Sequence, residues 1–185
     1  MDRRQKKTRQ AIFNAFTDLL EQKPFSAVTV SEIIAAADVG RSTFYTHFET
    51  KDDLLRALCA EVFEHVFSGA PVREQTHDFS STPRDLRAEL THILYHLRDS
   101  RRYVRGVLSR ESGEIFMSAF REHLKAVFAR ELRGAVDGVP EDYLLNHLAC
   151  DFAETVRWWM KNESYTPEEV SGFFLVTAPF LNRLQ

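Results

Sequence analysis

One stretch of the chain, residues 29–55, reads TVSEIIAAADVGRSTFYTHFETKDDLL and gathers polar side chains that can form directional hydrogen bonds. Arg41 can donate two parallel hydrogen bonds to a pair of acceptors such as O6 and N7 of guanine, and Ser42 offers a short hydroxyl beside it. Phe44 and Phe48 recur four residues apart, so they share one face of a helix and predict its buried side. The stretch therefore predicts a short helix that turns hydrogen-bonding side chains away from the core.

The elements around this helix carry their own start and turn signals. Thr29 and Glu32 have the spacing of a capping box, in which side chains and backbone satisfy each other's hydrogen bonds at a helix start. Residues 38–40, Asp-Val-Gly, predict the turn that follows, and residues 41–48 predict the next helix. An earlier helix is predicted over residues 6–21. Two short helices joined by a tight turn make a helix-turn-helix, although many such hairpins are only structural.

Basic side chains gather at the amino terminus, although the 185-residue chain as a whole carries a net charge of −3. Five of the first ten residues are Lys or Arg and one is acidic. Such a cluster fits contacts with phosphates, and it fits a solvated terminus equally well. A fourth helix is predicted over residues 51–67, and Lys51 with the free backbone N–H groups at its start would lie beside a phosphate.

The same stretch closely resembles the DNA-binding domain of the tetracycline-repressor (TetR) family of bacterial transcriptional regulators. The resemblance covers about residues 8–58 and rests on the pattern V-x-x-x-T-F-Y-x-H-F-x-x-K-x-x-L, which starts at Val39. Family members often carry glycine where Asp38 stands and serine or threonine where Gly40 stands. Aspartate tolerates a left-handed backbone better than most residues, so the turn is expected to form, whereas a hydroxyl cap for the next helix is lost.

The resemblance implies roles for individual residues of the helix-turn-helix. Arg41 and Ser42 match positions that commonly read bases, whereas Thr43, Tyr45, His47 and Lys51 match positions that commonly contact phosphate. The full set of predicted DNA contacts is Arg3, Arg4, Lys6, Lys7, Thr29, Arg41, Ser42, Thr43, Tyr45, Thr46, His47 and Lys51.

The rest of the chain also predicts helices, because no convincing run of period-two alternation occurs. Residues 68–82 combine Gly, Pro and polar residues without a period, so we expect a domain boundary there. Thr82-Pro83 predicts a helix start, and Thr166-Pro167-Glu168-Glu169 predicts the start of the last helix. The predicted fold is all-α, with three regions: a helix-turn-helix DNA-binding domain at 1–50, a connecting helix at 51–68, and a helical bundle for ligand binding and dimerisation at 82–185.

The last two predicted helices are apolar on more than one side. A helix that buries two faces lies in a core or at a subunit interface, so both interpretations stay open. The resemblance implies a dimer in which these helices pack against their symmetry mates. The predicted interface residues are Leu145, Phe152, Val156, Trp159, Phe173 and Phe174.

Aromatic residues elsewhere in the chain suggest a cavity for a hydrophobic or aromatic ligand, as in family members that bind small aromatic or cationic compounds. Ordinary core filling explains any one of these residues equally well. The candidate ligand-binding residues are Phe63, Phe67, Tyr95, Tyr103, Phe116, Phe120 and Trp158.

His92 and His96 stand four residues apart, a spacing that can hold a metal ion when a third ligand converges. No motif supplies that ligand, so we expect no metal and no cofactor. Cys59 and Cys150 are expected to be reduced thiols. The first ten residues lack the apolar stretch of a signal peptide, and no run of about 18 apolar residues occurs, so we expect a cytoplasmic protein without a membrane partner.

Three functions remain open at this point. The leading hypothesis is a homodimeric repressor that is not an enzyme, binds a palindromic double-stranded DNA operator and is released by a small hydrophobic or aromatic inducer. The second is a helical metal-binding protein or enzyme that uses His92 and His96. The third is a DNA-binding dimer whose effector is a partner protein. Whether the protein represses or activates stays open.

Overall fold

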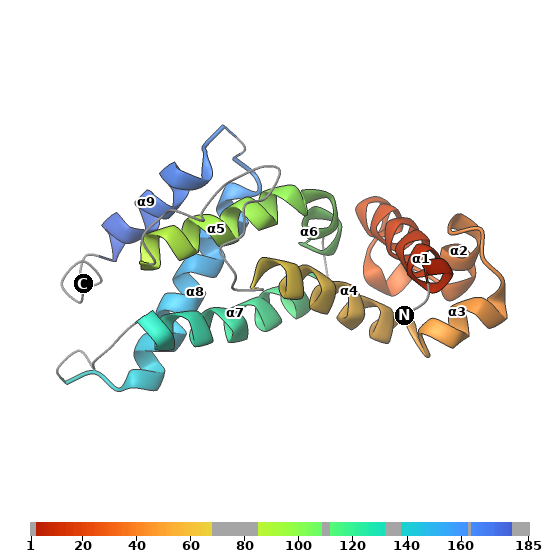
Figure 1. Ribbon diagram of the computed structural model, residues 1–185, viewed down its shortest axis with the longest axis horizontal. Helices are drawn as coiled ribbons and strands as arrows, with labels where there is room; N and C mark the ends of the chain where they lie inside the picture. Colours follow the sequence, from red (N-terminus) through yellow and green to blue (C-terminus); the bar gives the residue numbers. More distant parts are fainter. Residues whose placement is uncertain (1–2, 68–84, 109–111, 132–137, 163, 179–185) are drawn as a thin grey trace. The chain divides into compact units, whose positions relative to one another are not determined.

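The computed structural model describes residues 3–67, 85–108, 112–131, 138–162 and 164–178, and the regular elements in these ranges are helices (Figure 1). Their packing divides the chain into two compact units: unit one, Met1–Glu64 with Ser100–Phe116, and unit two, His65–Asp99 with Met117–Gln185. The helices are α1 (Arg3–Gln22), the short 3₁₀ helix η1 (Phe25–Ala27), α2 (Val30–Ala36), α3 (Arg41–His47), α4 (Lys51–Val66), α5 (Leu86–Asp99), α6 (Arg101–Leu108), α7 (Ser112–Glu131), α8 (Glu141–Trp159) and α9 (Pro167–Thr177). The predicted all-α class is confirmed for the part of the chain that the structure describes.

The core of unit one forms around the apolar face of α1. Phe13, Phe16 and Leu20 are buried on this face, and the same helix packs against both α2 and α6. One turn of a helix takes 3.6 residues, so residues three and four apart meet the same neighbours and build a continuous stripe. The stripe that the sequence predicts for this helix is therefore its buried side.

The turn between α2 and α3 has the geometry that its residues favour. Asp38 adopts a left-handed backbone with φ 51°, a conformation that aspartate tolerates better than most residues. Gly40 is the N-cap of α3 and offers no side-chain hydrogen bond to the free backbone N–H groups of that helix. The predicted turn, and the predicted loss of a hydroxyl cap, are both confirmed.

The contact between α1 and α6 joins segments that lie about 90 residues apart in the sequence. The hydroxyl of Tyr103 on α6 donates to Asn14 Oδ1 on α1 at 2.6 Å, and Gln10 contacts the same hydroxyl. Gly106 faces Thr17 so closely that a Cβ atom there would lie 2.6 Å from Thr17 Cγ2. Helix α6 therefore belongs with the first helices rather than with the bundle.

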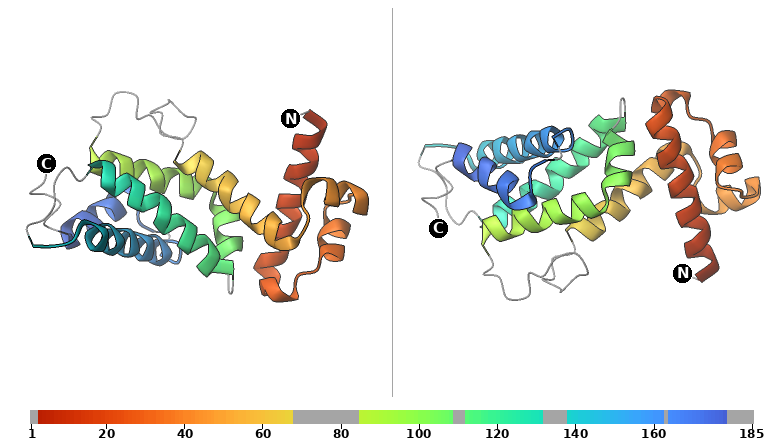
Figure 2. Two further views of the ribbon diagram at one scale, coloured as in Figure 1. Left: turned by 90° about the horizontal axis from the view of Figure 1, so that it is seen from below. Right: turned by 90° about the horizontal axis from the view of Figure 1, so that it is seen from above.

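In unit two, α9 packs against α5 and α8, and Figure 1 and the right view of Figure 2 show α5 and α9 side by side. The Phe174 ring lies 5.1 Å from that of Phe152 on α8, measured between centroids. A buried hydrogen bond of 2.8 Å between the hydroxyls of Thr91 and Ser171 joins α5 to α9. Buried hydroxyls need such partners, because an unsatisfied polar group in a core is costly.

Several helix boundaries follow the predicted signals. Helix α9 starts after Thr166, as predicted, and Thr166 forms a complete capping box with Glu169 there. Helix α5 begins at Leu86, where an Asp85 carboxylate oxygen accepts from the N–H of Ala88, whereas the predicted start at Thr82-Pro83 lies outside the described residues. The predicted domain boundaries, 1–50, 51–68 and 82–185, stay a prediction, and the packing groups residues 100–116 with the amino-terminal helices.

Candidate nucleic-acid interface

Helix α3 is fixed to unit one through two phenylalanines. Phe44 is completely buried and Phe48 is 4% exposed, and the Phe48 ring lies 5.7 Å from that of Phe13 on α1. Because these side chains take the inner face, the other residues of the short helix point outward. Arg41, Ser42, Tyr45 and Thr46 are exposed, and Thr43 and His47 are half-buried.

Arg41 lies at the junction of α2 and α3. Its Nη2 donates to the hydroxyl of Ser31 at 3.2 Å, and both side chains are exposed. This bond brings the start of α2 next to the start of α3, so a polar surface could meet both helices at once. Ser31 is absent from the residues predicted as DNA contacts. The signal that could have found it is its place two residues after the Thr29 cap, on the side of α2 opposite the buried Ile33.

Two of the predicted DNA contacts use their hydroxyls inside the protein. The Thr29 hydroxyl donates to Glu32 Oε2 at 2.8 Å and accepts from the Glu32 N–H at 3.3 Å, which completes the predicted capping box. Thr46 Oγ1 donates to the carbonyl of Ser42 at 2.9 Å. A hydroxyl has one proton to donate, so these two side chains face a partner as acceptors in this conformation.

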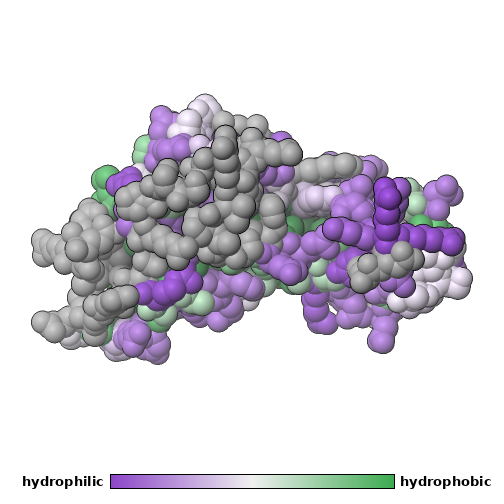
Figure 3. Space-filling model, in the orientation of Figure 1, coloured by the Kyte–Doolittle hydropathy of each residue, from purple (hydrophilic) through white to green (hydrophobic). Residues whose placement is uncertain are grey.

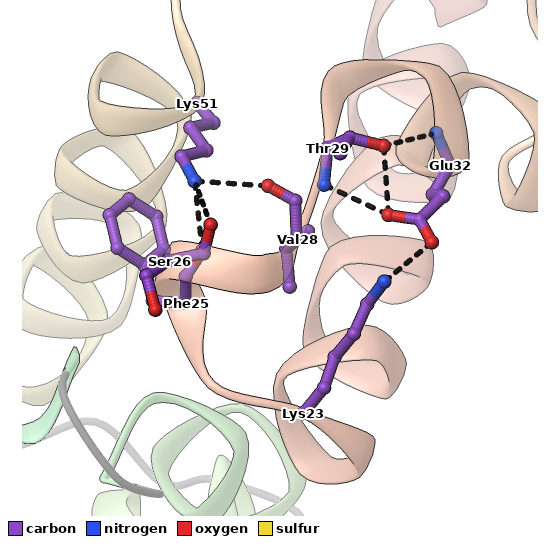
Figure 4. A network of polar contacts seen from close by, with 7 residues as sticks. All are labelled: Lys23, Phe25, Ser26, Val28, Thr29, Glu32 and Lys51. Carbon is purple, nitrogen blue, oxygen red and sulfur yellow. Dashed lines mark hydrogen bonds and ion pairs between the residues drawn. The ribbon is translucent and has the colours of Figure 1, made fainter.

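Glu32 connects the capping box to the end of α1. Its carboxylate pairs with the ammonium of Lys23 and accepts from both the N–H and the hydroxyl of Thr29 (Figure 4). The hydrogen bond from Lys23, followed by those from Thr29, lowers the pKa of Glu32 to about 2. Glu32 therefore carries its negative charge throughout the physiological pH range, where it also suits the positive end of the α2 dipole.

Lys51, at the first residue of α4, points its ammonium into the backbone that precedes α2. Its Nζ donates to the carbonyls of Phe25 at 2.9 Å, Ser26 at 3.2 Å and Val28 at 3.0 Å (Figure 4). The same nitrogen lies 4.6 Å from the centre of the Phe25 ring. The predicted phosphate contact is thus turned toward the protein in this structure.

The basic amino terminus forms the first two turns of α1. Arg3, Arg4, Lys6 and Lys7 are all exposed there, and Figure 3 shows hydrophilic side chains gathered over the α1–α3 region on the face that it draws. Arg9, one turn further on, has a different environment: it pairs with Glu61 and lies over the rings of Phe13 and Phe48. The four exposed cations can therefore meet a polyanion, whereas Arg9 helps to hold unit one together.

The candidate ligand-binding residues are divided between the two units. Phe63, Tyr103 and Phe116 lie in unit one, where the rings of Phe63 and Phe116 are 4.8 Å apart. Phe67 lies in unit two, with its ring 5.9 Å from that of Phe120. This division follows from the path of the chain, because α4 and α7 each begin in unit one and end in unit two.

The two remaining candidates have polar or solvent-exposed surroundings. The hydroxyl of Tyr95 donates to Glu168 Oε1 at 2.6 Å, and this hydrogen bond is the main reason why the pKa of Tyr95 is raised. Trp158 is 41% exposed and stacks on Tyr165, with 5.4 Å between ring centres. The ligand site stays a prediction for all seven residues.

Most of the predicted interface residues are buried within the single chain. Phe152, Val156, Trp159 and Phe174 are at most 5% exposed, and the Trp159 indole N–H donates to the carbonyl of Tyr165. Leu145 is half-buried and Phe173 is 42% exposed. The buried four fill the core of unit two, whereas Phe173 is exposed beside Trp158, Tyr165 and Val176, which are exposed as well. The dimer interface stays a prediction.

His92 and His96 face each other on α5, with 2.9 Å between their Nε2 atoms, and His96 is completely buried. Among the described residues, no group of three or more His, Cys, Asp and Glu side chains is placed to hold a metal ion. Cys59 is buried, which raises the pKa of its thiol to about 12, and Cys150 is exposed. In the described ranges no helix combines the length and the apolar character that crossing a membrane requires.

Helices α2 and α3 form a helix-turn-helix near the amino terminus, and the polar face of α3 is exposed. Because further helices pack into a bundle after it, the chain has the architecture of a helix-turn-helix protein. The family described as bacterial regulatory proteins, tetR family, matches residues 12–58. A solved structure of a TetR transcriptional regulator from Streptococcus agalactiae 2603V is 34% identical, with 95% of this chain and 96% of that chain covered and a TM-score of 0.72. The chain therefore belongs to the TetR family.

Two further relatives match over about a third of this chain. The HTH-type transcriptional regulator YxbF of Bacillus subtilis (strain 168) is 37% identical over 71 residues, which are 36% of this chain and 19% of that protein. The HTH-type dhaKLM operon transcriptional activator DhaS of Lactococcus lactis subsp. lactis (strain IL1403) is 33% identical over 61 residues, 33% of this chain and 30% of that protein. The chain thus spans less than a third of the length of either relative.

Proposed function

We propose that this protein is a sequence-specific DNA-binding regulator of transcription that acts as a homodimer. The observation that carries the proposal is the outward polar face of α3: Arg41, Ser42 and Tyr45 are exposed while Phe44 anchors the helix in unit one. Membership of the TetR family, shown by a full-length relative, supports the same function.

In the proposed complex α3 lies in the major groove of double-stranded DNA. Arg41 exchanges its bond with Ser31 for two hydrogen bonds to guanine, and Ser42 contacts a neighbouring base edge. Thr43, Tyr45 and His47 contact phosphates along the flanks of the helix, and Ser31 joins them from α2. Phosphate contacts fix the register of the protein on the duplex, whereas the base contacts select its sequence.

The exposed amino end of α1 adds charge to this surface. Arg3, Arg4, Lys6 and Lys7 are basic and solvent-exposed, so they can neutralise phosphates beside the groove that α3 occupies. Each neutralised phosphate releases bound counterions, which makes the affinity fall as the salt concentration rises. The net charge of −3 for the whole chain favours this localised contact over a general attraction to nucleic acid.

The proposed dimer forms through α8 and α9. Trp158, Tyr165 and Phe173 form a cluster of rings at this surface, with 5.3 Å between the centres of Tyr165 and Phe173, and Val176 on α9 is 73% exposed. Large exposed apolar patches commonly mark interaction sites. A twofold dimer would present two copies of α3 to a palindromic operator, about 34–36 Å apart in successive major grooves.

We further propose a repressor that is released by a small hydrophobic or aromatic molecule bound in unit two. Aromatic rings gather there around Phe67, whose ring lies 5.9 Å from Phe120 and 5.1 Å from His123. A ligand releases DNA only to the extent that it binds the DNA-incompetent conformation more tightly, and a shift from 1:99 to 99:1 requires about 5.5 kcal/mol of such preference.

The decisive experiment selects DNA fragments from a genomic library with the purified protein and sequences them. The proposal requires an enriched motif with twofold symmetry, whose affinity falls with added salt and with Arg41→Ala. A screen of apolar and aromatic compounds for release of that complex then tests the ligand. If no motif is enriched, sequence-specific binding is refuted. If a motif is enriched but no compound releases the protein from it, the DNA-binding function stands and the small-molecule inducer is refuted.

A further inference from the structure

Lys51 connects two elements of unit one that the chain separates by more than twenty residues. It starts α4, and its ammonium donates to three carbonyls between Phe25 and Val28, the segment that leads from α1 into α2. Carbonyls at the end of a short helix have few donors within that helix. The Phe25 carbonyl accepts from the Val28 N–H, and the lysine adds a donor to it and to the carbonyls of Ser26 and Val28. The contact therefore fixes the approach to α2 against the start of α4.

The three hydrogen bonds use all the donors that a lysine has. An ammonium group carries three N–H bonds, and the three carbonyl oxygens lie at 2.9, 3.2 and 3.0 Å from Nζ. The face of the Phe25 ring adds a cation–π contact at 4.6 Å. A phosphate oxygen would have to displace one of these acceptors, so the geometry does not present this ammonium to DNA.

The position of Lys51 in α4 points the same way. A cation in the first turn of a helix is repelled by the positive end of the helix dipole. In α4 the negative charges of Asp52 and Asp53 in the same turn offset this repulsion. The long side chain carries its charge away from that end and toward the carbonyl oxygens of the neighbouring segment, where the potential is negative. The lysine thus gains its stabilisation from the carbonyl groups of the protein backbone.

The anchored segment leads directly into the helix that supports α3. Val28, whose carbonyl Lys51 holds, is followed by Thr29, the N-cap of α2, and α2 supports Arg41 through Ser31. We propose that Lys51 is a positioning residue that clamps α2, and with it the reading helix α3, to the start of α4, and that it is not a phosphate ligand. The DNA-binding part of this inference rests on the proposed function.

Two substitutions separate the clamp from a phosphate contact. Lys51→Met keeps an apolar stem of similar length and removes the charge. Lys51→Arg keeps the charge, but its planar guanidinium spreads its donors over three nitrogens and cannot direct three bonds from one atom to three converging carbonyls. A phosphate ligand would tolerate arginine, because guanidinium binds phosphate at least as well. A clamp would not.

The first measurement uses the DNA-free protein. The clamp predicts that Lys51→Met and Lys51→Arg both lower the melting temperature, by about 5–10 °C for the loss of charge-assisted hydrogen bonds in a unit of this size. It also predicts faster amide hydrogen exchange at Val28 and at Glu32, while the amides of α1 around Phe16 change less. Unchanged melting and exchange in both variants would overturn the proposal, whether or not the protein binds DNA.

The second measurement uses the duplex selected in the genomic experiment, well below the melting temperature of each variant. The clamp predicts that both variants bind about tenfold more weakly at every salt concentration, so that the slope of log K against log salt equals that of the natural protein. Lys7→Met, at an exposed position of α1, is the matched control and should lower the slope by about 0.9. A lowered slope in Lys51→Met, or natural affinity in Lys51→Arg, would overturn the clamp while leaving the DNA-binding function intact.

Discussion

The close contact between Gly106 on α6 and Thr17 on α1 makes a sharp prediction for the substitution Gly106→Ala. A Cβ atom at this position would lie 2.6 Å from Thr17 Cγ2 and 3.1 Å from the Thr17 carbonyl oxygen. Thr17 cannot easily move away, because it is completely buried and its hydroxyl donates to the carbonyl of Phe13 at 2.9 Å. Either the Thr17 side chain rotates and loses that bond, or α6 moves outward.

The expected magnitude follows from two opposing effects. Overpacking a well-packed contact costs about 1–3 kcal/mol, and loss of the Thr17 hydrogen bond adds about 1 kcal/mol. Alanine in place of glycine inside a helix returns about 1 kcal/mol of helix propensity. We therefore expect Gly106→Ala to lower the free energy of unfolding by about 1–3 kcal/mol. Gly172→Ala in α9 is the matched control: its nearest neighbour would be Arg87 Nη1 at 3.6 Å, an ordinary contact, so it should raise stability by up to about 1 kcal/mol.

Urea unfolding of both variants, followed by circular dichroism, measures these effects. Thr17→Ser removes the obstructing methyl group and keeps the hydroxyl, so combined with Gly106→Ala it should restore part of the lost stability. A double-mutant cycle over the two sites should give a favourable coupling of about 1 kcal/mol or more. If Gly106→Ala is as stabilising as Gly172→Ala, or if the coupling is zero, helices α1 and α6 do not pack as closely as the structure has them.

Three further predictions concern base reading by Arg41, the charge of Glu32 and the dimer interface. Arg41→Ala should cost about 1–3 kcal/mol of binding free energy at one base pair of the selected operator and relax specificity there; equal losses on matched and mismatched duplexes in a titration would contradict its role in base reading. The lowered pKa of Glu32 means that its contribution to stability is present above pH 4.5 and is lost as the pH falls toward 2, so the melting temperatures of the natural protein and Glu32→Gln should converge over that range; a constant difference would show that Glu32 is not held in its charged form. Phe173→Asp should yield folded monomers in sedimentation experiments because this ring is 42% exposed, whereas Trp159→Asp, at 5% exposed, should unfold unit two; a Phe173→Asp protein that still sediments as a dimer would place the interface elsewhere.

The start and turn signals of the helix-turn-helix could be predicted because they depend on near neighbours. The capping boxes at Thr29 and Thr166 join residues three apart, and the left-handed turn at Asp38 depends on a single residue. Phe44 and Phe48 followed from helical periodicity in the same way. Interactions over such short separations are formed wherever the helix forms, so the sequence alone contains the information.

Two neighbouring tryptophans show that the sequence does not predict which side of α8 is buried. The sequence places Trp158 among the candidate ligand-binding residues and Trp159 among the candidate interface residues, but it does not say how exposed each one is. In the structure Trp158 is 41% exposed and Trp159 is 5% exposed in the core of unit two. A helical wheel separates adjacent residues by about 100°, but it does not say which side the neighbouring helix covers. That depends on where α9 packs, which the local sequence of α8 does not encode.

The amino-acid sequence by itself determined the all-α class, the helix-turn-helix and the polar face of α3, because periodicity and capping act within a few residues. The tertiary structure alone decided which groups meet across the chain. In the folded chain Lys51 donates to the carbonyl of Phe25, 26 residues away, and Gly106 packs against Thr17. Such contacts arise when separate helices bury their apolar faces together, and the resulting distances depend on the packing of the whole unit rather than on any one segment.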